Sequence, residues 1–152
     1  LMQQMLAYLR SFPEALHHPK EEAHLFRLLR QRSGDFHALL AELERQHTLE
    51  AALVEAVAGA LARHSAADAA TLEALGEAVQ RLAGAVWEHM SLEEAQVLPA
   101  ARRHLQPEDW KAVAAAFTAH VDPLREVDVG QPLTAAFAQI ATRLLATPPA
   151  PV

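Results

Sequence analysis

The sequence predicts an all-α protein folded as an up-and-down helical bundle. Composition is the first reason: 51% of the 152 residues are hydrophobic, aromatic residues make up only 5%, and there are only five glycines. A chain of this kind, rich in Ala and Leu and poor in β-branched residues, favours helix over strand. The second reason is that apolar residues recur at steps of three and four through long segments separated by short turn-like stretches. Long amphipathic helices joined by short turns pack as antiparallel neighbours.

Taken in order, the apolar pattern gives one element after another. The first covers residues 1–32, with a break or restart at Phe12-Pro13 and with Pro19 in the first turn of its second stretch. Ser33-Gly34-Asp35 has the composition of a turn with an N-cap. Further helices are predicted over 36–63, 68–105, 107–120 and 133–146, and Pro99 is expected to end or kink the third element. We expect one domain over residues 1–146, in which the helices after the third long one are extra C-terminal helices, and a disordered tail over 147–152.

Charge and residue usage exclude several functional classes. The formal net charge of −6 argues against a nucleic-acid-binding protein, which needs a basic face. Cysteine is absent, so disulfides and zinc–thiolate sites are excluded and any metal must bind nitrogen and oxygen. No apolar run approaches the ~20 residues of a transmembrane helix, and no signal peptide is visible at this N-terminus. A cytoplasmic protein that binds neither nucleic acid nor membrane is expected.

Nine histidines are many for this length, and three of them fall on core-facing stripes. His18 and Glu22 are four residues apart, so one helical turn places both on the face that continues to Leu25. His89 and Glu93 repeat this spacing on the stripe that includes Val86 and Val97, and His47 continues the stripe of Leu40 and Leu43. The sequence therefore predicts that three helices each bring metal-type ligands into the core.

Buried carboxylates without partners are costly, and a cation lying between them and the imidazoles would offset that cost. Imidazole and carboxylate ligands suit iron, manganese or zinc, and two carboxylates can bridge two metals inside a bundle. The candidate ligands are His18, Glu22, His47, His89 and Glu93. An alternative register pairs His17 with Glu21, although Leu25 and Phe26 favour His18 with Glu22. A plain bundle without metal would require these groups to satisfy one another.

Two segments carry a resemblance to a known family. His17-His18-Pro19-Lys20-Glu21-Glu22 and the stretch from His89 to Glu93 resemble the HxxxE motifs of the hemerythrin-like, HHE cation-binding family, and Gln46-His47 resembles its single-histidine helix. The likeness covers roughly residues 1–125. It implies a hemerythrin-like four-helix bundle whose five candidate ligands hold two carboxylate-bridged non-haem irons, with one metal, or manganese or zinc, as alternatives. It also implies oxygen binding, sensing or iron-centre repair, with O2 or NO as the small ligand.

The sequence departs from that family pattern at its start. Family members carry a further His ligand on a helix before the first motif, and here a helical pattern is already running at Leu1. Either the given sequence omits this first helix or the protein has lost it. A true loss would favour a single metal and would leave His120 as a reserve ligand. An open bundle face would favour a homodimer. No separate catalytic group stands out, so enzyme activity is left open. A second functional hypothesis is a regulatory or interaction module in which metal is structural or absent.

Overall fold

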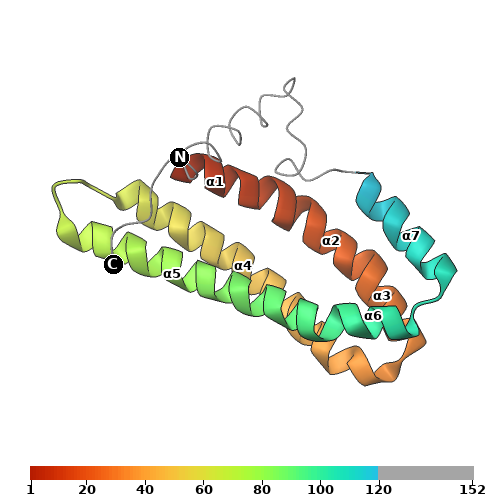
Figure 1. Cartoon of the computed structure of the whole chain (residues 1–152). Coiled ribbons are helices and arrows are strands. Elements are labelled where there is room, and N and C mark those ends of the chain that lie inside the picture. Colours follow the sequence, from red (N-terminus) through yellow and green to blue (C-terminus); the bar gives the residue numbers. More distant parts are fainter. Residues whose placement is uncertain (120–152) are drawn as a thin grey trace, which may run out of the picture.

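The computed structural model describes residues 1–119, and its long elements are all helices (Figure 1). The first helix runs from Met2 to Arg32 through five consecutive segments: α1 (Met2–Leu9), the π-helical η1 (Arg10–His17), α2 (His18–Lys20), the π-helical η2 (Glu21–Phe26) and α3 (Arg27–Arg32). A single 3₁₀ turn, η3 (Gly34–Phe36), leads into α4 (His37–Arg63). The third helix joins α5 (Ala69–Leu92), the π-helical η4 (Glu93–Val97) and α6 (Leu98–His104), and α7 (Pro107–Thr118) follows.

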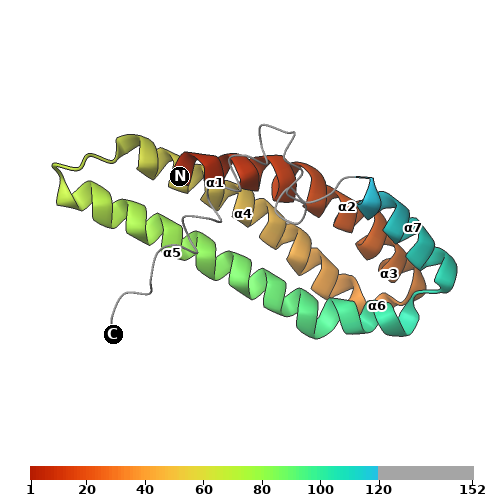
Figure 2. The same cartoon turned by 45° about the horizontal axis from the view of Figure 1, so that its top comes forward.

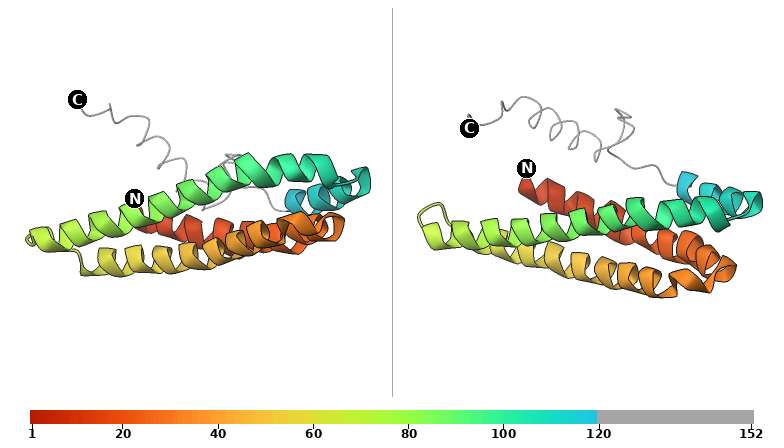
Figure 3. Two further views of the ribbon diagram at one scale, coloured as in Figure 1. Left: turned by 90° about the horizontal axis from the view of Figure 1, so that it is seen from below. Right: turned by 60° about the horizontal axis from the view of Figure 1, so that its bottom comes forward.

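The three long helices lie side by side and alternate in direction, and α7 folds back beside the end of the first (Figures 1 and 2). Figure 3 shows that the hairpin formed by α4 and α5 extends beyond the start of α1. This arrangement confirms the predicted all-α, up-and-down bundle for the described residues, which contain no strand. The helix predicted over 133–146 and the tail over 147–152 lie outside the described residues.

The predicted break at Phe12-Pro13 is wrong, because the first helix continues through both Pro13 and Pro19. The third helix likewise continues past Pro99 to His104. A proline inside an α-helix removes one hydrogen bond and its ring clashes with the carbonyl four residues earlier. For Pro19 that carbonyl belongs to Ala15 in η1, and for Pro99 it belongs to Ala95 in η4. Both carbonyls therefore lie in π-helical turns, which are wider than α-helical ones. The helices absorb these prolines by a local change of helix type.

Side-chain caps fix where the helices begin. The Ser33 hydroxyl accepts a hydrogen bond from the Asp35 amide at 3.2 Å, as expected for the predicted turn. The Asp68 carboxylate accepts from the Ala70 amide at 3.0 Å and starts α5. At α7 the Asp109 carboxylate accepts from the Gln106 amide at 2.9 Å, in a capping box. These caps define the short turns that hold the long helices antiparallel.

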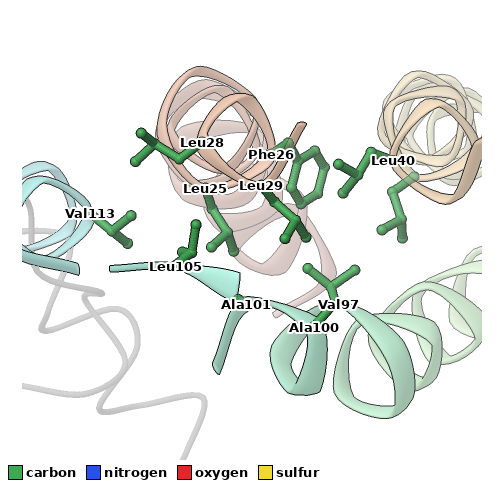
Figure 4. Packing of buried hydrophobic residues seen from close by; sticks show 11 residues of the cluster. Leu25, Phe26, Leu28, Leu29, Leu40, Val97, Ala100, Ala101, Leu105 and Val113 are labelled. Carbon is green, nitrogen blue, oxygen red and sulfur yellow. The ribbon is translucent and has the colours of Figure 1, made fainter. Parts of the chain in front are cut away.

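Two separate apolar cores lie along the bundle. The α7-end core is formed where η2, α3, α4, α6 and α7 meet, and its fully buried members include Phe26, Leu29, Leu40, Leu43 and Val97 (Figure 4). The hairpin-end core joins α1, α4 and α5 and contains Leu6, Val54, Val57, Ala60, Leu75, Ala78 and Leu82. Each long helix therefore carries a stretch between the two cores, and the polar side chains described next occupy it.

Among the described helices, none is long and apolar enough to cross a membrane.

Candidate metal centre

Three helices bring a group of buried histidines and carboxylates together between the two cores. We call this group the metal cluster, and it consists of His18, Glu21, His47, His89 and Glu93. Ligand atoms of the three histidines all lie within 4.8 Å of one another, and the same holds for Glu21, His47, His89 and Glu93. The His18 and His47 rings stack in parallel, with centroids 4.0 Å apart and planes 3° from parallel. The stretch between the cores is thus filled by groups that bind metals.

Four of the five residues proposed from the sequence lie in this cluster, and the fifth does not. His18, His47 and His89 are 4–8% exposed, and Glu93 joins them. Glu22 instead has a side chain that is 40% exposed and lies outside both ligand groups, whereas its neighbour Glu21 is 5% exposed and lies inside. In the first motif the structure therefore uses the glutamate of the alternative register.

The π-helical geometry of η2 explains why Glu21, rather than the predicted Glu22, faces the cluster. In an α-helix, a residue three or four positions before Leu25 and Phe26 shares their face, and Glu22 would point inward. A π-helical turn is wider and contains about 4.4 residues. In η2 the inward position therefore lies four residues before Leu25 and five before Phe26, which is Glu21. Spacing rules that assume 3.6 residues per turn cannot anticipate this shift.

Each of three cluster residues is held from outside by one hydrogen-bonding partner. The His47 Nδ1 lies 2.7 Å from a Glu22 carboxylate oxygen, and the His89 Nδ1 lies 3.3 Å from the Gln46 side-chain oxygen. These contacts place the proton of each ring on Nδ1 and leave Nε2 free to bind a cation. On the carboxylate side, His17 Nε2 lies 3.2 Å from Glu21 Oε1 and leaves Oε2 facing the cluster. Metal-binding histidines are typically oriented by outer partners of this kind.

Inside the cluster, the distances between histidine nitrogens and carboxylate oxygens are longer than those outer hydrogen bonds. His47 Nε2 is 3.5 Å from Glu21 Oε2, and His89 Nε2 is 3.6 Å from Glu93 Oε1. Glu21 Oε2, His47 Nε2 and Glu93 Oε1 are buried, and none has a hydrogen-bond partner. Two ligands about 2.1 Å from one tetrahedral ion lie roughly 3.4 Å apart. These atoms are too far apart for good hydrogen bonds and are spaced as ligands around a cation would be.

Burial sets the protonation of the cluster in the absence of a cation. Burial, followed by the charge of His47, lowers the pKa of His18 to about 3 and that of His89 to about 4, so both rings are neutral near pH 7. Burial raises the pKa of Glu93 to about 8, with the Glu21 carboxylate adding to the effect. Burial would also raise the pKa of Glu21, but the neighbouring rings of His17 and then His47 lower it to about 2. Neutral imidazoles are the form that binds metal, and a cation would displace the Glu93 proton.

Glu50 is a buried carboxylate beside the cluster that the sequence reasoning missed. It is 5% exposed, and burial raises its pKa to about 7. It follows His47 by three residues on α4 and precedes Val54 by four, so it lies on the same inward stripe. The signal was present in the spacing, because the stripe of His47, Val54 and Val57 passes through position 50. No HxxxE pattern marks it, however, since the motif spacing from His47 falls on Ala51.

Two cavities open onto the cluster from different sides. One, of about 280 Å³, lies between the first helix and α5 and is lined partly by Tyr8, Phe12 and Val86, with Glu50 and Glu93 also on its wall. The other, of about 190 Å³, lies between the first helix and α4 and is lined by Glu14, His18, Pro19, Glu22, His47, Thr48 and Ala51. Each wall carries two glutamates, Glu50 and Glu93 in the first cavity and Glu14 and Glu22 in the second, and the first also carries aromatic side chains.

A comparison with protein-family models matches residues 2–101 to the hemerythrin HHE cation binding domain. The chain belongs to this family. The match covers both HxxxE segments, the single-histidine helix and both apolar cores up to Ala101. Among curated proteins and among solved structures, no match to the chain was found. Membership in the hemerythrin HHE family agrees with the cation-binding character of the buried cluster. His120, the reserve ligand named above, lies outside the described residues.

Proposed function

We propose that this hemerythrin-family chain binds two non-haem iron ions and handles oxygen or another small diatomic or peroxidic ligand. One observation carries the proposal: a buried cluster of His and Glu side chains whose facing atoms have no partner and are spaced for a cation. Unsatisfied buried carboxylates and imidazoles are costly unless something positive lies between them. Nitrogen and oxygen ligands without thiolate suit iron, with manganese and zinc as the alternatives.

The residues of the chain have distinct roles in this proposal. Glu21, His47, His89 and Glu93 hold a cation, and Glu22, Gln46 and His17 fix the orientation of the ligands. Iron, when bound, supplies redox chemistry and a coordination position for a small ligand. The apolar wall formed by Leu9, Phe12 and Val86 keeps bulk water scarce at the face of the cluster that a small ligand would reach.

The test is the metal content per chain, measured on protein produced with supplemented iron and purified without chelator. The ultraviolet-visible spectrum is recorded beside it in air, after reduction under nitrogen, and after return to air. About two irons per chain, with a spectrum that changes on reduction and recovers in air, are expected for a di-iron site inside a bundle. Folded helices without stoichiometric metal would refute the proposal.

The exposed face of α5 supports a second candidate function, an interaction module in which metal is structural. Leu72, Val79 and Met90 share one stripe of that helix at 38–58% exposure, and Trp87 beside them is 74% exposed. Exposed apolar rows of this kind mark protein contact sites. For a structural metal, zinc should replace iron without loss of stability, and thermal unfolding measured with each metal tests this second function.

A further inference from the structure

Glu50 is a buried carboxylate that neither ligand group of the cluster contains, and it has no described hydrogen-bonding partner for Oε1. Its Oε2 lies 3.9 Å from His18 Nε2, and its Oε1 lies 3.8 Å from His89 Nδ1. Both separations exceed a hydrogen bond. The Glu50–His18 separation is somewhat longer than the roughly 3.4 Å between two ligands on one ion with metal–ligand bonds of about 2.1 Å. The His89 Nδ1 carries its proton toward Gln46 and is not a free ligand atom.

The stacked rings of His18 and His47 divide the ligand atoms into two sets. His47 Nε2 faces Glu21 at 3.5 Å, whereas His18 Nε2 faces Glu50 at 3.9 Å. The rings are parallel with centroids 4.0 Å apart, and their Nε2 atoms have different carboxylate neighbours, so each can bind a different ion. One set contains Glu21, His47, His89 and Glu93 and is complete without His18. Glu50 then supplies the carboxylate oxygen paired with His18 Nε2.

His18 and Glu50 face a cavity, as do His89 and Glu93 of the first set. The cavity of about 280 Å³ is lined by His18, Glu50, His89 and Glu93 together with apolar side chains. A cation held by His18 and Glu50 would therefore keep positions open toward this space, and Glu93 could reach it as a shared ligand. A carboxylate placed there only for packing would leave Oε1 buried without a hydrogen-bonding partner, which is unfavourable.

We propose that Glu50, together with His18, holds the second of the two cations, on the side of the cluster that faces the cavity. This rests on the proposed metal-binding function, because it assigns a ligand within that site. It explains why a carboxylate lies on the helix of the single histidine, one turn after His47. Glu50 also adds a ligand from α4. The five residues proposed from the sequence provide too few protein ligands for two ions, and Glu50 supplies one more.

The test counts equivalents of Co²⁺, and separately of anaerobic Fe²⁺, bound by the full chain and by its variants. Absorption titration and metal analysis after desalting give the stoichiometry and the affinity of each equivalent. Glu50→Gln keeps the shape of the side chain and removes the charge. We expect it to bind the first equivalent normally and the second at least tenfold more weakly. His18→Asn should lose the same equivalent, and Glu94→Gln, an exposed glutamate beside Glu93, is the matched control.

The outcomes separate this inference from the function beneath it. Two equivalents bound by Glu50→Gln with unchanged affinities would overturn the role of Glu50 and leave the di-iron function standing. A single equivalent bound by the unaltered chain would also overturn it. No metal bound by the unaltered chain would refute the proposed function itself. Circular dichroism checks that each variant is folded, and if Glu50→Gln is not, the His18→Asn titration decides the question in the same way.

Discussion

The α7-end core and the metal cluster lie on the same three helices, a few turns apart. They differ in whether their polar groups have partners within the protein. At the α7 end, Arg30 pairs with Glu44 at 2.6 Å and Arg32 with Asp109 at 2.7 Å, while the interior is apolar. In the cluster, Glu21, His47 and Glu93 each keep a buried atom without a partner. The first region has its polar groups paired, whereas the second keeps buried atoms that a bound cation would pair. Unsatisfied buried groups, rather than burial or helix type alone, therefore mark the candidate site.

The largest expected effect comes from a substitution in the α7-end core. Leu29→Ala removes a fully buried side chain from the α7-end core and should lower the free energy of unfolding by about 2–5 kcal/mol. Since Leu29 lies among apolar neighbours, the loss should be the same with and without metal. Urea denaturation in the presence of metal and in chelator measures it. The control is Leu72→Ala at a site that is 58% exposed, where a change below about 0.5 kcal/mol is expected. A Leu29→Ala loss that appears only with metal would show that the two regions are not independent.

The opposite substitution in the cluster should sharpen the contrast. Glu93→Leu replaces a buried carboxyl group, whose Oε1 has no partner, by an apolar side chain of similar size. Without metal, the variant should be more stable than the unaltered chain by about 1–3 kcal/mol, the cost of leaving a buried polar group without a hydrogen-bonding partner. With metal, it should lose the stabilisation that binding gives. Thermal unfolding with and without Co²⁺ tests both parts. A metal-free variant that is less stable would mean that Glu93 is already satisfied in the fold.

The choice between Glu21 and Glu22 tests the helical register of the first motif. Glu22→Gln removes the charge of the partner of His47 Nδ1 and should weaken metal binding about tenfold, or about 1.4 kcal/mol. Glu21→Gln removes a buried group of the cluster and should weaken binding at least ten times more than that. Competition titrations against a chromophoric chelator measure both. If Glu22→Gln caused the larger loss, the π-helical register would be wrong for the metal-bound protein.

Much of this molecule could be predicted from the sequence, and the failures share one cause. The all-α bundle, the turn at Ser33 and the meeting of His18, His47, His89 and Glu93 follow from apolar periodicity. The prediction assumed α-helical geometry throughout, so it placed a break at Pro13 and put Glu22 rather than Glu21 on the inward face. Local π-helical turns are decided by tertiary packing and leave no clear signal in one sequence. Glu50 was missed for another reason, because it follows His47 by three residues and no HxxxE spacing marks it.

The smallest expected effect concerns the ion pair that joins α7 to the end of α3. Arg32 donates to Asp109 through two bonds of 2.7 and 3.0 Å, and Arg32 is largely exposed, so Asp109→Asn should shift the urea midpoint only slightly at pH 7. The Arg32 hydrogen bond, followed by that of the Gln106 amide, lowers the pKa of Asp109 from its ordinary value of 3.8. A lowered folded pKa gives stability that is present above the unfolded pKa and is lost as the pH falls through the folded one. The gap between the two urea midpoints should therefore be constant from pH 7 to pH 5 and close below pH 4. A gap that persisted in acid would assign the role of Asp109 to its shape in the capping box rather than to its charge, and the polar groups at the α7 end would then be satisfied by hydrogen bonding alone.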